Sequence, residues 1–353
     1  MSNGPLLSVA EVEANVHVVG VEGTSDDLDV PMEACFRDVA FKAANQLGSV
    51  NSVNIIRLLV QAVHYFYAYL RLEPNAVQPA TFAVPCGAGG HLSGGMLALQ
   101  MGLPLRLLAC TNANDALHQV LSTGALRMGA PTRQTVSPSM DIQMPYNLWR
   151  LLFVASGGDG SAVRRWQQDL SHTGVLTLPS AVRRWIGARV RTVSIGDEET
   201  LQTIRNVHLA CGYVMDPHTA VGVAGSLRSP FEGGGGKSSD GGGSVGVPGA
   251  LTVCLGCAHA VKFLPAVANA LHLDLAAALE MLLEGETHPC VRAVGAMARE
   301  LQRRETSTGG SATAVGPAVS MPAGCTAVLR QGEDWEARLR QIVSSASKPA
   351  SKL

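Results

Sequence analysis

Residues 81 to 101 carry the feature that most constrains the fold of this chain, a glycine-rich turn between two apolar stretches. The segment reads TFAVPCGAGGHLSGGMLALQM, which predicts a short buried strand and then a helix that starts near His91. Gly87, Gly89 and Gly90 allow close approach to the backbone amides between them, and the helix N-terminus adds further N–H groups and a positive dipole end. Such backbone geometry suits a phosphate, so a phosphorylated ligand is the leading hypothesis.

The same residues leave two alternatives to a general phosphate site. A glycine-rich strand-to-helix turn with a purely structural role stays open, because spacing alone does not separate it from a binding loop. A dinucleotide site is disfavoured, because Leu92 stands at the third glycine position of that pattern and no acidic residue follows at about 20 positions.

The order of predicted elements indicates an α/β fold with a mostly parallel sheet and helices on both faces. Around the glycine turn, we expect strands at 81–86 and 104–110, helices at 91–101 and 113–122, and a C-cap at Gly124. The other expected elements are a strand over 13–23, a helix over 31–46, a helix from Ser52 to about Leu70 capped by Asn51 or Ser52, helices over 160–210 with a cap at Asp197, and a helix from Pro217 to Ala224.

Composition excludes several classes of protein. Of the 353 residues, 46% are apolar and 16% are charged, which is typical of a globular chain with one full domain and part of a second. A net charge of −1 without a basic block offers no surface for nucleic acid. Polar residues interrupt the longest apolar run, 250–283, so no transmembrane helix is expected, and the first residues do not have the pattern of a signal peptide.

The chain has eight cysteines, and without a secretory signal we expect them to be reduced thiols. Cys254 and Cys257 form a C-x-x-C pair. Zinc would need a second pair, and thioredoxin-type chemistry would need the pair at the start of a helix, so we expect no metal. The favoured interpretation is two small apolar residues on a buried strand.

From the glycine turn onward, the chain resembles the threonine synthases, a family of pyridoxal phosphate enzymes. The family motifs VP(T/S)GNFGN, KMGLP, TNxNDxLHR and SPSMDIQxPSN correspond here to VPCGAGGH, QMGLP, TNANDALHQ and SPSMDIQMPYN. VMDPHTAVGV and CAHAVKFLPAV match two later motifs, and NVHVVGVEG and SVNSVNIIRLLVQ match two earlier ones. The alanine in the loop and the closing LRQGEDW are most similar to the animal threonine synthase-like branch. The resemblance implies the type II fold of pyridoxal phosphate enzymes.

The resemblance also implies that an N-terminal segment of the family pattern is absent. In the family, the Schiff-base lysine and a serine- and glycine-rich loop precede the NVHV motif, which starts here at Asn15. None of the five lysines has the family's context; they are Lys42, Lys237, Lys262, Lys348 and Lys352. We therefore expect residues 1–48 to be a remnant of the smaller domain and residues 49–353 to be the large cofactor-binding domain. Flexible glycine- and serine-rich insertions are expected at 229–249 and 307–324.

The resemblance assigns residues to the cofactor. The backbone amides expected to hold its phosphate are those of Gly87, Ala88, Gly89, Gly90 and His91. His91 replaces an asparagine or aspartate, and we expect it either to add charge to an anion site or to cap the helix. Cys257 stands where the family has a threonine or serine that bonds the pyridine nitrogen, and a thiol is a weaker hydrogen-bonding partner.

A second set of residues is expected to face the substrate by the same resemblance: Asn51, Ser52, Asn54 and Arg57. Arg57 could pair with a substrate phosphate through two hydrogen bonds, and the alternative is an ordinary surface ion pair. Other polar motif residues are expected to have structural roles. Asn112, Asn114 and Asp115 would shape a loop and cap a helix, and Asp216 and His218 would be a helix cap and its neighbour.

The family reaction converts O-phosphohomoserine and water to threonine and phosphate, and the threonine synthase-like branch releases phosphate with a 2-oxo acid and ammonia. The resemblance implies that the family's Schiff-base lysine tethers the cofactor and moves protons during the reaction. Because no lysine here has that context, we expect this chain to be inactive. Three explanations stay open: an enzyme whose start was misplaced, a non-catalytic paralogue that binds the ligand, and a decayed copy that folds poorly.

The chain ends in Ser351, Lys352 and Leu353, a peroxisomal address when it stands at the C-terminus. We expect recognition by a peroxisomal import receptor and favour the peroxisome over the cytoplasm. A chance tripeptide is the alternative.

Overall fold

A computed structural model describes residues 18–73, 78–228, 251–286, 288, 291–292, 295–296, 299 and 327–346. Several expectations concern residues outside these ranges: the start of the strand at 13–23, the insertions at 229–249 and 307–324, Lys237, Lys348, Lys352, and the C-terminal Ser351, Lys352 and Leu353.

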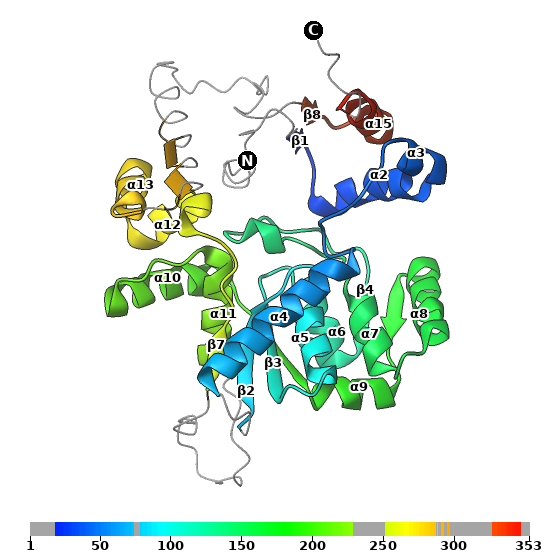
Figure 1. Ribbon diagram of the computed structural model, residues 1–353, viewed down its shortest axis with the longest axis horizontal. Helices are drawn as coiled ribbons and strands as arrows, with labels where there is room; N and C mark the ends of the chain where they lie inside the picture. Colours follow the sequence, from blue (N-terminus) through cyan, green and yellow to red (C-terminus); the bar gives the residue numbers. More distant parts are fainter. Residues whose placement is uncertain are drawn as a thin grey trace. The chain divides into compact units, whose positions relative to one another are not determined.

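One or more helices separate each strand from the next along the chain (Figure 1). The strands are β1 (Val19–Val21), β2 (Ala80–Pro85), β3 (Leu105–Thr111), β4 (Ala125–Arg127), β5 (Val175–Thr177), β6 (Val190–Ser194), β7 (Thr252–Cys254) and β8 (Ala327–Leu329). The helices are α2 (Ser25–Arg37), α3 (Val39–Ala44), α4 (Ile55–Leu72), α5 (Gly90–Gln100), α6 (Ala116–Thr123), α7 (Leu148–Ala155), α8 (Gly160–Thr173), α9 (Ser180–Gly187), α10 (Asp197–Cys211), α11 (Pro217–Arg228), α12 (Leu264–Leu271), α13 (Leu275–Leu283) and α15 (Trp335–Ala346), with short 3₁₀ turns η1 (Pro138–Met140) and η2 (Ala260–Phe263).

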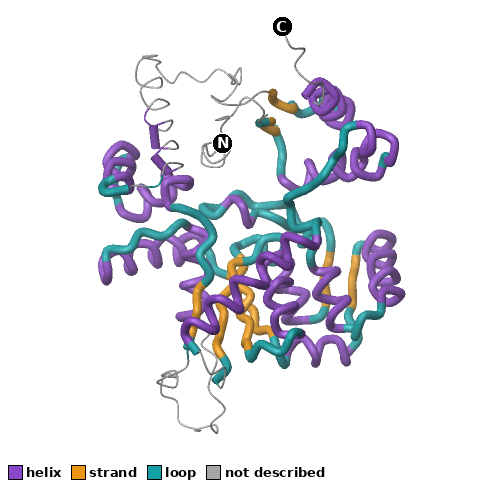
Figure 2. The backbone as a smooth tube through the Cα atoms, viewed as in Figure 1, coloured by secondary structure: helices purple, strands orange, loops and turns teal. Residues whose placement is uncertain are grey.

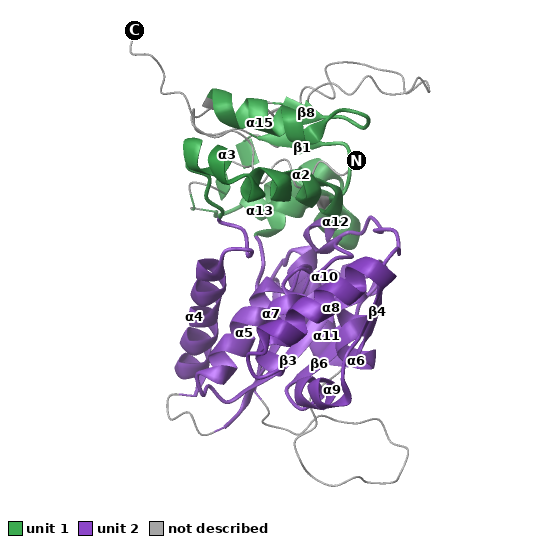
Figure 3. Cartoon of the chain, turned by 90° about the vertical axis from the view of Figure 1, so that its right-hand side faces the viewer, with its two compact units in different colours: residues 1–49, 259–353 green, residues 50–258 purple. Residues whose placement is uncertain are grey.

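The chain divides into two compact units (Figure 3). Unit 1 comprises Met1–Ser49 and His259–Leu353, and unit 2 comprises Val50–Ala258. The expected division into domains at 1–48 and 49–353 stays a prediction. Its first boundary falls beside that of the compact units, whereas the C-terminal residues belong to unit 1.

Unit 2 is built on a four-stranded sheet in the order β6-β3-β2-β7, and every neighbouring pair is parallel. The strands lie side by side in Figure 2. Side chains alternate between the two faces. Phe82 and Val84 of β2 pack on one face with residues of α5 and α6, whereas Ala83 packs on the other face with Val221 and Ala224 of α11. The predicted α/β fold with a parallel sheet is confirmed.

The expected elements around the glycine turn are confirmed within a few residues as β2, α5, β3 and α6, and Gly124 is the C-cap of α6 with φ of 78°. The prediction of an all-helical stretch over 160–210 was wrong. It contains α8, α9 and α10, but also β5 and β6, and β6 pairs with β3 in the main sheet. Gly196, and not Asp197, occupies the N-cap of α10.

Two helix starts also differ from expectation. The helix expected over 31–46 begins at Ser25 and breaks at Asp38, and Pro31 lies inside it. Thr24 and Asp27 form a capping box there, which fixes the earlier start. The helix expected from Ser52 begins at Ile55, because the side chain of Asn54 accepts a hydrogen bond from the backbone N–H of Ile56.

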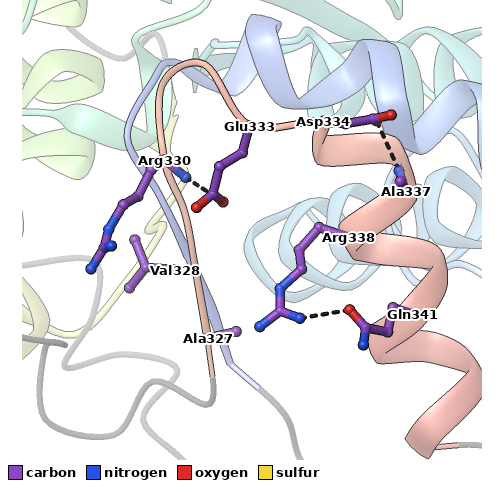
Figure 4. Close-up of a pocket in the computed structure, with 8 residues that line it drawn as sticks. All are labelled: Ala327, Val328, Arg330, Glu333, Asp334, Ala337, Arg338 and Gln341. Atoms are coloured by element: carbon purple, nitrogen blue, oxygen red, sulfur yellow. Dashed lines mark hydrogen bonds between the residues drawn. The ribbon is translucent and has the colours of Figure 1, made fainter.

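Unit 1 contains the parallel pair β1 and β8, whose register places Val19 opposite Ala327. An ion pair of 2.8 Å between Arg340 and Asp38 joins α15 to the break between α2 and α3. A cavity of about 570 Å³ lies against β8 and α15, where Arg338 donates to Gln341 (Figure 4). Among the described helices, none is by itself long and apolar enough to cross a membrane; α12 and α13 meet that criterion only as a pair bent by 119°.

Candidate functional site

The sheet brings the glycine loop and Cys257 to the same edge of unit 2. Ala83 of β2 lies opposite Cys254 of β7 in a parallel register, and the N–H of Leu255 donates to the carbonyl of Ala83 at 3.0 Å. Both strands therefore end together, and the loop after Pro85 leaves the sheet beside the loop that carries Cys257. The carboxyl edge of a parallel sheet is where ligands bind in α/β folds.

The turn itself has the backbone that the sequence predicted. Gly89 is the N-cap of α5 with φ of 77°, a left-handed conformation that favours glycine. Within the described part of the chain, none of the amides from Gly87 to His91 donates a hydrogen bond to another protein group. Free donors at a helix N-terminus with a left-handed cap suit an anion.

Glycine is required in the loop for packing as well. A Cβ on Gly90 would lie 2.8 Å from the Cβ of Ser52, and one on Gly87 would lie 3.1 Å from the Cα of Met140. The loop is thus held between the residues before α4 and the 3₁₀ turn η1. This close packing also agrees with the structural interpretation of the turn, so packing alone does not separate the two.

Two of the four residues expected to face the substrate lie beside the loop. The side-chain amide of Asn147 donates to the Ser52 hydroxyl at 2.9 Å, and the Tyr146 hydroxyl donates to Asn51 at 2.7 Å. The backbone N–H of Asn147 donates to the carbonyl of Ala88 at 3.1 Å, which ties this polar group to the loop. Sequence reasoning did not assign Tyr146 and Asn147, although both stand in the SPSMDIQMPYN motif.

The other two residues serve the start of α4. Asn54 is its N-cap, and the exposed Arg57 donates through Nη1 to the carbonyl of Val50 at 2.9 Å. Among the described residues Arg57 makes no ion pair, and its expected contact with a substrate phosphate stays a prediction. Its positive charge nonetheless contributes to the low pKa of His91, so the guanidinium acts on the start of α5.

His91 differs from both of its expected roles. Burial of the ring, together with the neighbouring His64 and Arg57, lowers the pKa of His91 to about 4, so the ring is neutral at neutral pH and adds no charge. Gly89, and not His91, occupies the N-cap position. Nε2 of His91 is buried and has no hydrogen-bond partner among the described residues, while the hydroxyl of Tyr65 donates to the His91 carbonyl. The cofactor contact expected from its amide stays a prediction.

A buried carboxylate organises the segment around Cys257. Asp216 accepts hydrogen bonds from the side chains of His218, at 2.8 Å, and Thr219, and from the N–H of Ala258 at 3.3 Å. Burial raises the pKa of Asp216, but the hydrogen bonds from His218 and Thr219 outweigh it and hold the pKa below its ordinary value. The predicted cap is confirmed, because Asp216 also accepts hydrogen bonds from the backbone N–H groups of His218 and Thr219 in the first turn of α11.

Cys257 is positioned by this carboxylate group. Its backbone N–H donates to the Thr219 hydroxyl at 3.0 Å. Desolvation of the sulfur and the charge of Asp216 raise the pKa of the Cys257 thiol, so it stays protonated at neutral pH. The interpretation of both C-x-x-C residues as part of a buried strand was wrong for Cys257, because β7 ends at Cys254 and Cys257 lies in the loop that follows.

The TNANDALHQ and SPSMDIQ motifs meet in a second polar network. The side chains of Asn112 and Asn114 donate to Asp141 at 2.8 and 2.9 Å, and Thr135 donates to it at 2.6 Å. Burial raises the pKa of Asp141 although these hydrogen bonds oppose it. Asn112 and Asn114 therefore shape a loop, as expected. Asp115 occupies the N-cap position of α6 but makes no side-chain capping bond.

A cavity of about 430 Å³ in unit 2 lies between α4, α5 and α7 and is lined mainly by apolar side chains. Ser93 and Tyr146 are among its lining residues, and the Ser93 hydroxyl donates to the carbonyl of Gly89 at 3.0 Å. The cavity thus lies behind the loop, and none of the residues predicted for cofactor or substrate lines it.

No protein-family model matches the chain. Threonine synthase-like 2 of Rattus norvegicus is 32% identical over 340 residues, which cover 95% of this chain and 60% of that protein. Threonine synthase of Pseudomonas aeruginosa is 36% identical over 261 residues, which cover 72% of this chain and 51% of that protein. The crystal structure of pyridoxal phosphate-bound threonine synthase from Brucella melitensis superposes with a TM-score of 0.70 at 30% identity, over 97% of this chain and 62% of that one.

The chain belongs to the threonine synthase family. The predicted resemblance to this family is confirmed. The predicted fold is also confirmed, because unit 2 has the parallel α/β architecture of type II pyridoxal phosphate enzymes. The chain spans about 60% or less of the length of these family members.

Proposed function

We propose that this member of the threonine synthase family binds pyridoxal phosphate at the carboxyl edge of the unit 2 sheet and recognises a phosphorylated amino acid there. One observation carries the proposal. The glycine loop presents a run of backbone amides, from Gly87 to His91, that have no protein partner among the described residues. These donors belong to the segment that the family pattern assigns to the cofactor phosphate.

The residues present fit the phosphate end of this cofactor. Its phosphate would be held by the amides of Gly87, Ala88, Gly89, Gly90 and His91, supported by the dipole of α5. His91 is neutral, so the site relies on backbone donors and not on a side-chain charge. When bound, pyridoxal phosphate supplies an electron sink for chemistry at the carbon next to an amino group.

The fit at the ring end is weaker. The Thr219 hydroxyl donates to Asp216 and accepts from the backbone N–H of Cys257, so the backbone that carries the thiol is fixed in position. A protonated thiol is a poor donor compared with the hydroxyl that the family pattern has at this position. We therefore propose that Cys257 contacts the pyridine nitrogen but polarises it less than a hydroxyl would.

On the substrate side, Asn51 and Ser52 are the residues best placed to orient a ligand near the loop. Both are fixed by Tyr146 and Asn147, whose backbone is bonded to the loop at Ala88. We propose a phosphorylated amino acid of the O-phosphohomoserine type as the substrate class, processed in family members either to threonine and phosphate or to a 2-oxo acid. Asn54, the N-cap of α4, and the exposed Arg57 in its first turn would contact the substrate at the edge of this site.

The positions of the lysines bear on whether this chain can bind the cofactor covalently. The only lysine in the sequence of unit 2 is Lys237, which lies outside the described residues, and the described Lys42 and Lys262 belong to unit 1. Lys42 lies 5.9 Å from the ring centroid of Phe36 on α2. We propose that this chain binds the cofactor without a covalent link and does not turn substrate over, as a ligand-binding protein.

The test is a titration of purified protein with pyridoxal phosphate, followed by absorbance of the bound cofactor, then borohydride reduction and mapping of any modified lysine. Gly90→Ala is the informative variant, because its new Cβ must displace Ser52. Gly187→Ala is the matched control, since a Cβ there meets nothing within 4 Å.

Saturable binding that Gly90→Ala weakens and Gly187→Ala preserves would support the proposed site. A stable adduct on one of the five lysines would contradict the non-covalent proposal. Absence of saturable binding by the folded wild-type protein would overturn the cofactor proposal itself.

We also propose import into the peroxisome through Ser351, Lys352 and Leu353, on the basis of the sequence alone. A fluorescent protein fused to the N-terminus of the full chain is expected to concentrate in peroxisomes. Removal of the three residues is expected to leave it in the cytoplasm. Identical distributions of the two fusions would contradict the proposal.

A further inference from the structure

The side chain of His218 joins helix α11 to the 3₁₀ turn η1. It is buried, with 3% of its surface exposed, and it lies in the first turn of α11. Nδ1 lies 2.8 Å from a carboxylate oxygen of Asp216, and Nε2 accepts a hydrogen bond of 3.1 Å from the backbone N–H of Ser139. Because both ring nitrogens are bonded, the imidazole is fixed in one orientation between the two segments.

These two hydrogen bonds agree on one protonation state of the ring. A backbone N–H can only donate, so Nε2 carries no proton. The pKa of Asp216 is below its ordinary value, and an ionised carboxylate can only accept, so the proton of the imidazole lies on Nδ1. His218 is therefore a neutral acceptor toward Ser139, and a protonated ring could not make that bond.

The turn that His218 contacts packs directly against the glycine loop. A Cβ on Gly87 would lie 3.1 Å from the Cα of Met140 and 3.1 Å from the carbonyl oxygen of Ser139. Backbone therefore meets backbone at this contact. Because interiors are closely packed, a shift of η1 would move Gly87 or open a gap beside it.

Helix α11 is itself fixed against the strand that leads into the loop. One turn after His218, Gly222 lies so close to β2 that a Cβ there would be 3.0 Å from the Cγ of Pro85. Ala224 packs with Ala83 of the same strand. The hydrogen bond from η1 to His218 therefore ends on a rigid part of unit 2.

The carboxylate that binds His218 also fixes the segment at the other end of the proposed site. Asp216 accepts from the Thr219 hydroxyl, and that hydroxyl accepts from the backbone N–H of Cys257. One buried carboxylate therefore supports the turn beside the glycine loop through His218, and the segment of Cys257 through Thr219. Both ends of the proposed cofactor site depend on the position of this one group.

We propose that His218 is a positioning residue of the cofactor site: it holds η1, and through η1 the backbone of Gly87, where the loop amides receive the phosphate. The inference rests on the proposed binding of pyridoxal phosphate, and it adds a residue that acts through the turn and not through contact with the ligand. A mere neighbour of a helix cap would need the bond to Asp216 but not the bond to Ser139.

Two substitutions at His218 separate these roles. In His218→Gln, the side-chain oxygen can take the place of Nε2 and accept from the Ser139 N–H. In His218→Asn, the shorter amide can take the place of Nδ1 and donate to Asp216, but the Ser139 N–H loses its acceptor. Ile186→Val is the control for a loss of stability alone, because Ile186 is buried on α9, which packs against α6, α7 and β6.

Two measurements are made on each folded variant of the full chain. Calorimetric titration gives the ratio of the dissociation constants for pyridoxal and pyridoxal phosphate, which reports the contribution of the phosphate. His218→Asn is expected to reduce this ratio at least about tenfold, because part of the binding energy must then order the loop, whereas His218→Gln and Ile186→Val preserve it within about threefold. Hydrogen exchange of residues 137–142 without ligand is expected to be faster in His218→Asn only.

This pattern would support the proposal. Binding by the wild type with an unchanged ratio in both His218 variants would overturn the inference about His218 and leave the cofactor proposal intact. An equal fall of the ratio in both variants, or unchanged exchange of residues 137–142 in His218→Asn, would also overturn it, because the bond to Ser139 would then not position the loop. Absence of saturable binding by the folded wild type would overturn the proposed function, and this inference with it.

Discussion

Replacement of His91 by asparagine is expected to change how the stability of the protein depends on pH. The pKa of His91 is lowered from 6.5 to about 4 by burial and by the neighbouring His64 and Arg57. Between these values the unfolded chain binds a proton that the folded chain does not bind, so the folded state loses stability as the pH falls from 6.5 towards 4. The pKa difference corresponds to about 3 kcal/mol.

Urea unfolding of wild type and His91→Asn at pH 7, 5.5 and 4 measures this contribution. The free energy of unfolding of wild type, relative to the variant, is expected to fall by about 3 kcal/mol between pH 7 and pH 4. His172→Asn is the control, because the side chain of His172 is exposed to solvent on α8. A difference between wild type and His91→Asn that stays constant with pH would refute the argument that the ring is buried and neutral.

Three further changes test the packing around the site by urea unfolding. Asp216→Asn is expected to lower stability by about 2–4 kcal/mol, because the buried donors around it lose a charged acceptor; no change would show that this group does not organise the segment. Gly95→Ala is expected to cost about 1–3 kcal/mol, because its Cβ would lie 2.7 Å from the Tyr65 ring, and a neutral result would contradict that packing. Asn112→Ala is expected to cost about 1–3 kcal/mol and to raise the pKa of Asp141 further, which carbon-detected NMR titration would show.

Sequence reasoning predicted the elements whose signal is local. The strand, glycine turn and helix around Gly89 follow from residues within a few positions of one another, and so does the C-cap at Gly124. The capping role of Asp216 is likewise written in its immediate neighbours. These features were predicted because backbone sterics and short-range hydrogen bonds decide them.

Elements that depend on distant partners were missed. Three of the five residues of β6 are polar, namely Arg191, Thr192 and Ser194, and they give no regular alternation. Its pairing with β3 makes it a strand of the main sheet. The helix expected from residue 31 begins earlier, at Ser25, because Thr24 and Asp27 form a capping box there, and Pro31 lies inside the helix. The short pair of β4 with β5 joins residues about 50 positions apart, and neither strand has a strong local pattern.

The candidate site shows the same limit. The amides of the glycine loop were predicted from the turn, whereas the neutral state of His91 follows from burial and from charges on α4 that the sequence does not place. The polar group of Asn51, Ser52, Tyr146 and Asn147 joins side chains 95 positions apart, and it required the fold.

The affinity of the protein for pyridoxal phosphate, compared with pyridoxal, tests the central claim most directly. If the amides of the glycine loop hold the phosphate, calorimetric titration should show at least about 100-fold tighter binding of pyridoxal phosphate, since hydrogen bonds to a charged group contribute about 1.5–3 kcal/mol each. Gly90→Ala should reduce that ratio, because the loop can no longer pack against Ser52. Equal affinity for the two compounds would contradict a phosphate site at the loop and would favour its purely structural role.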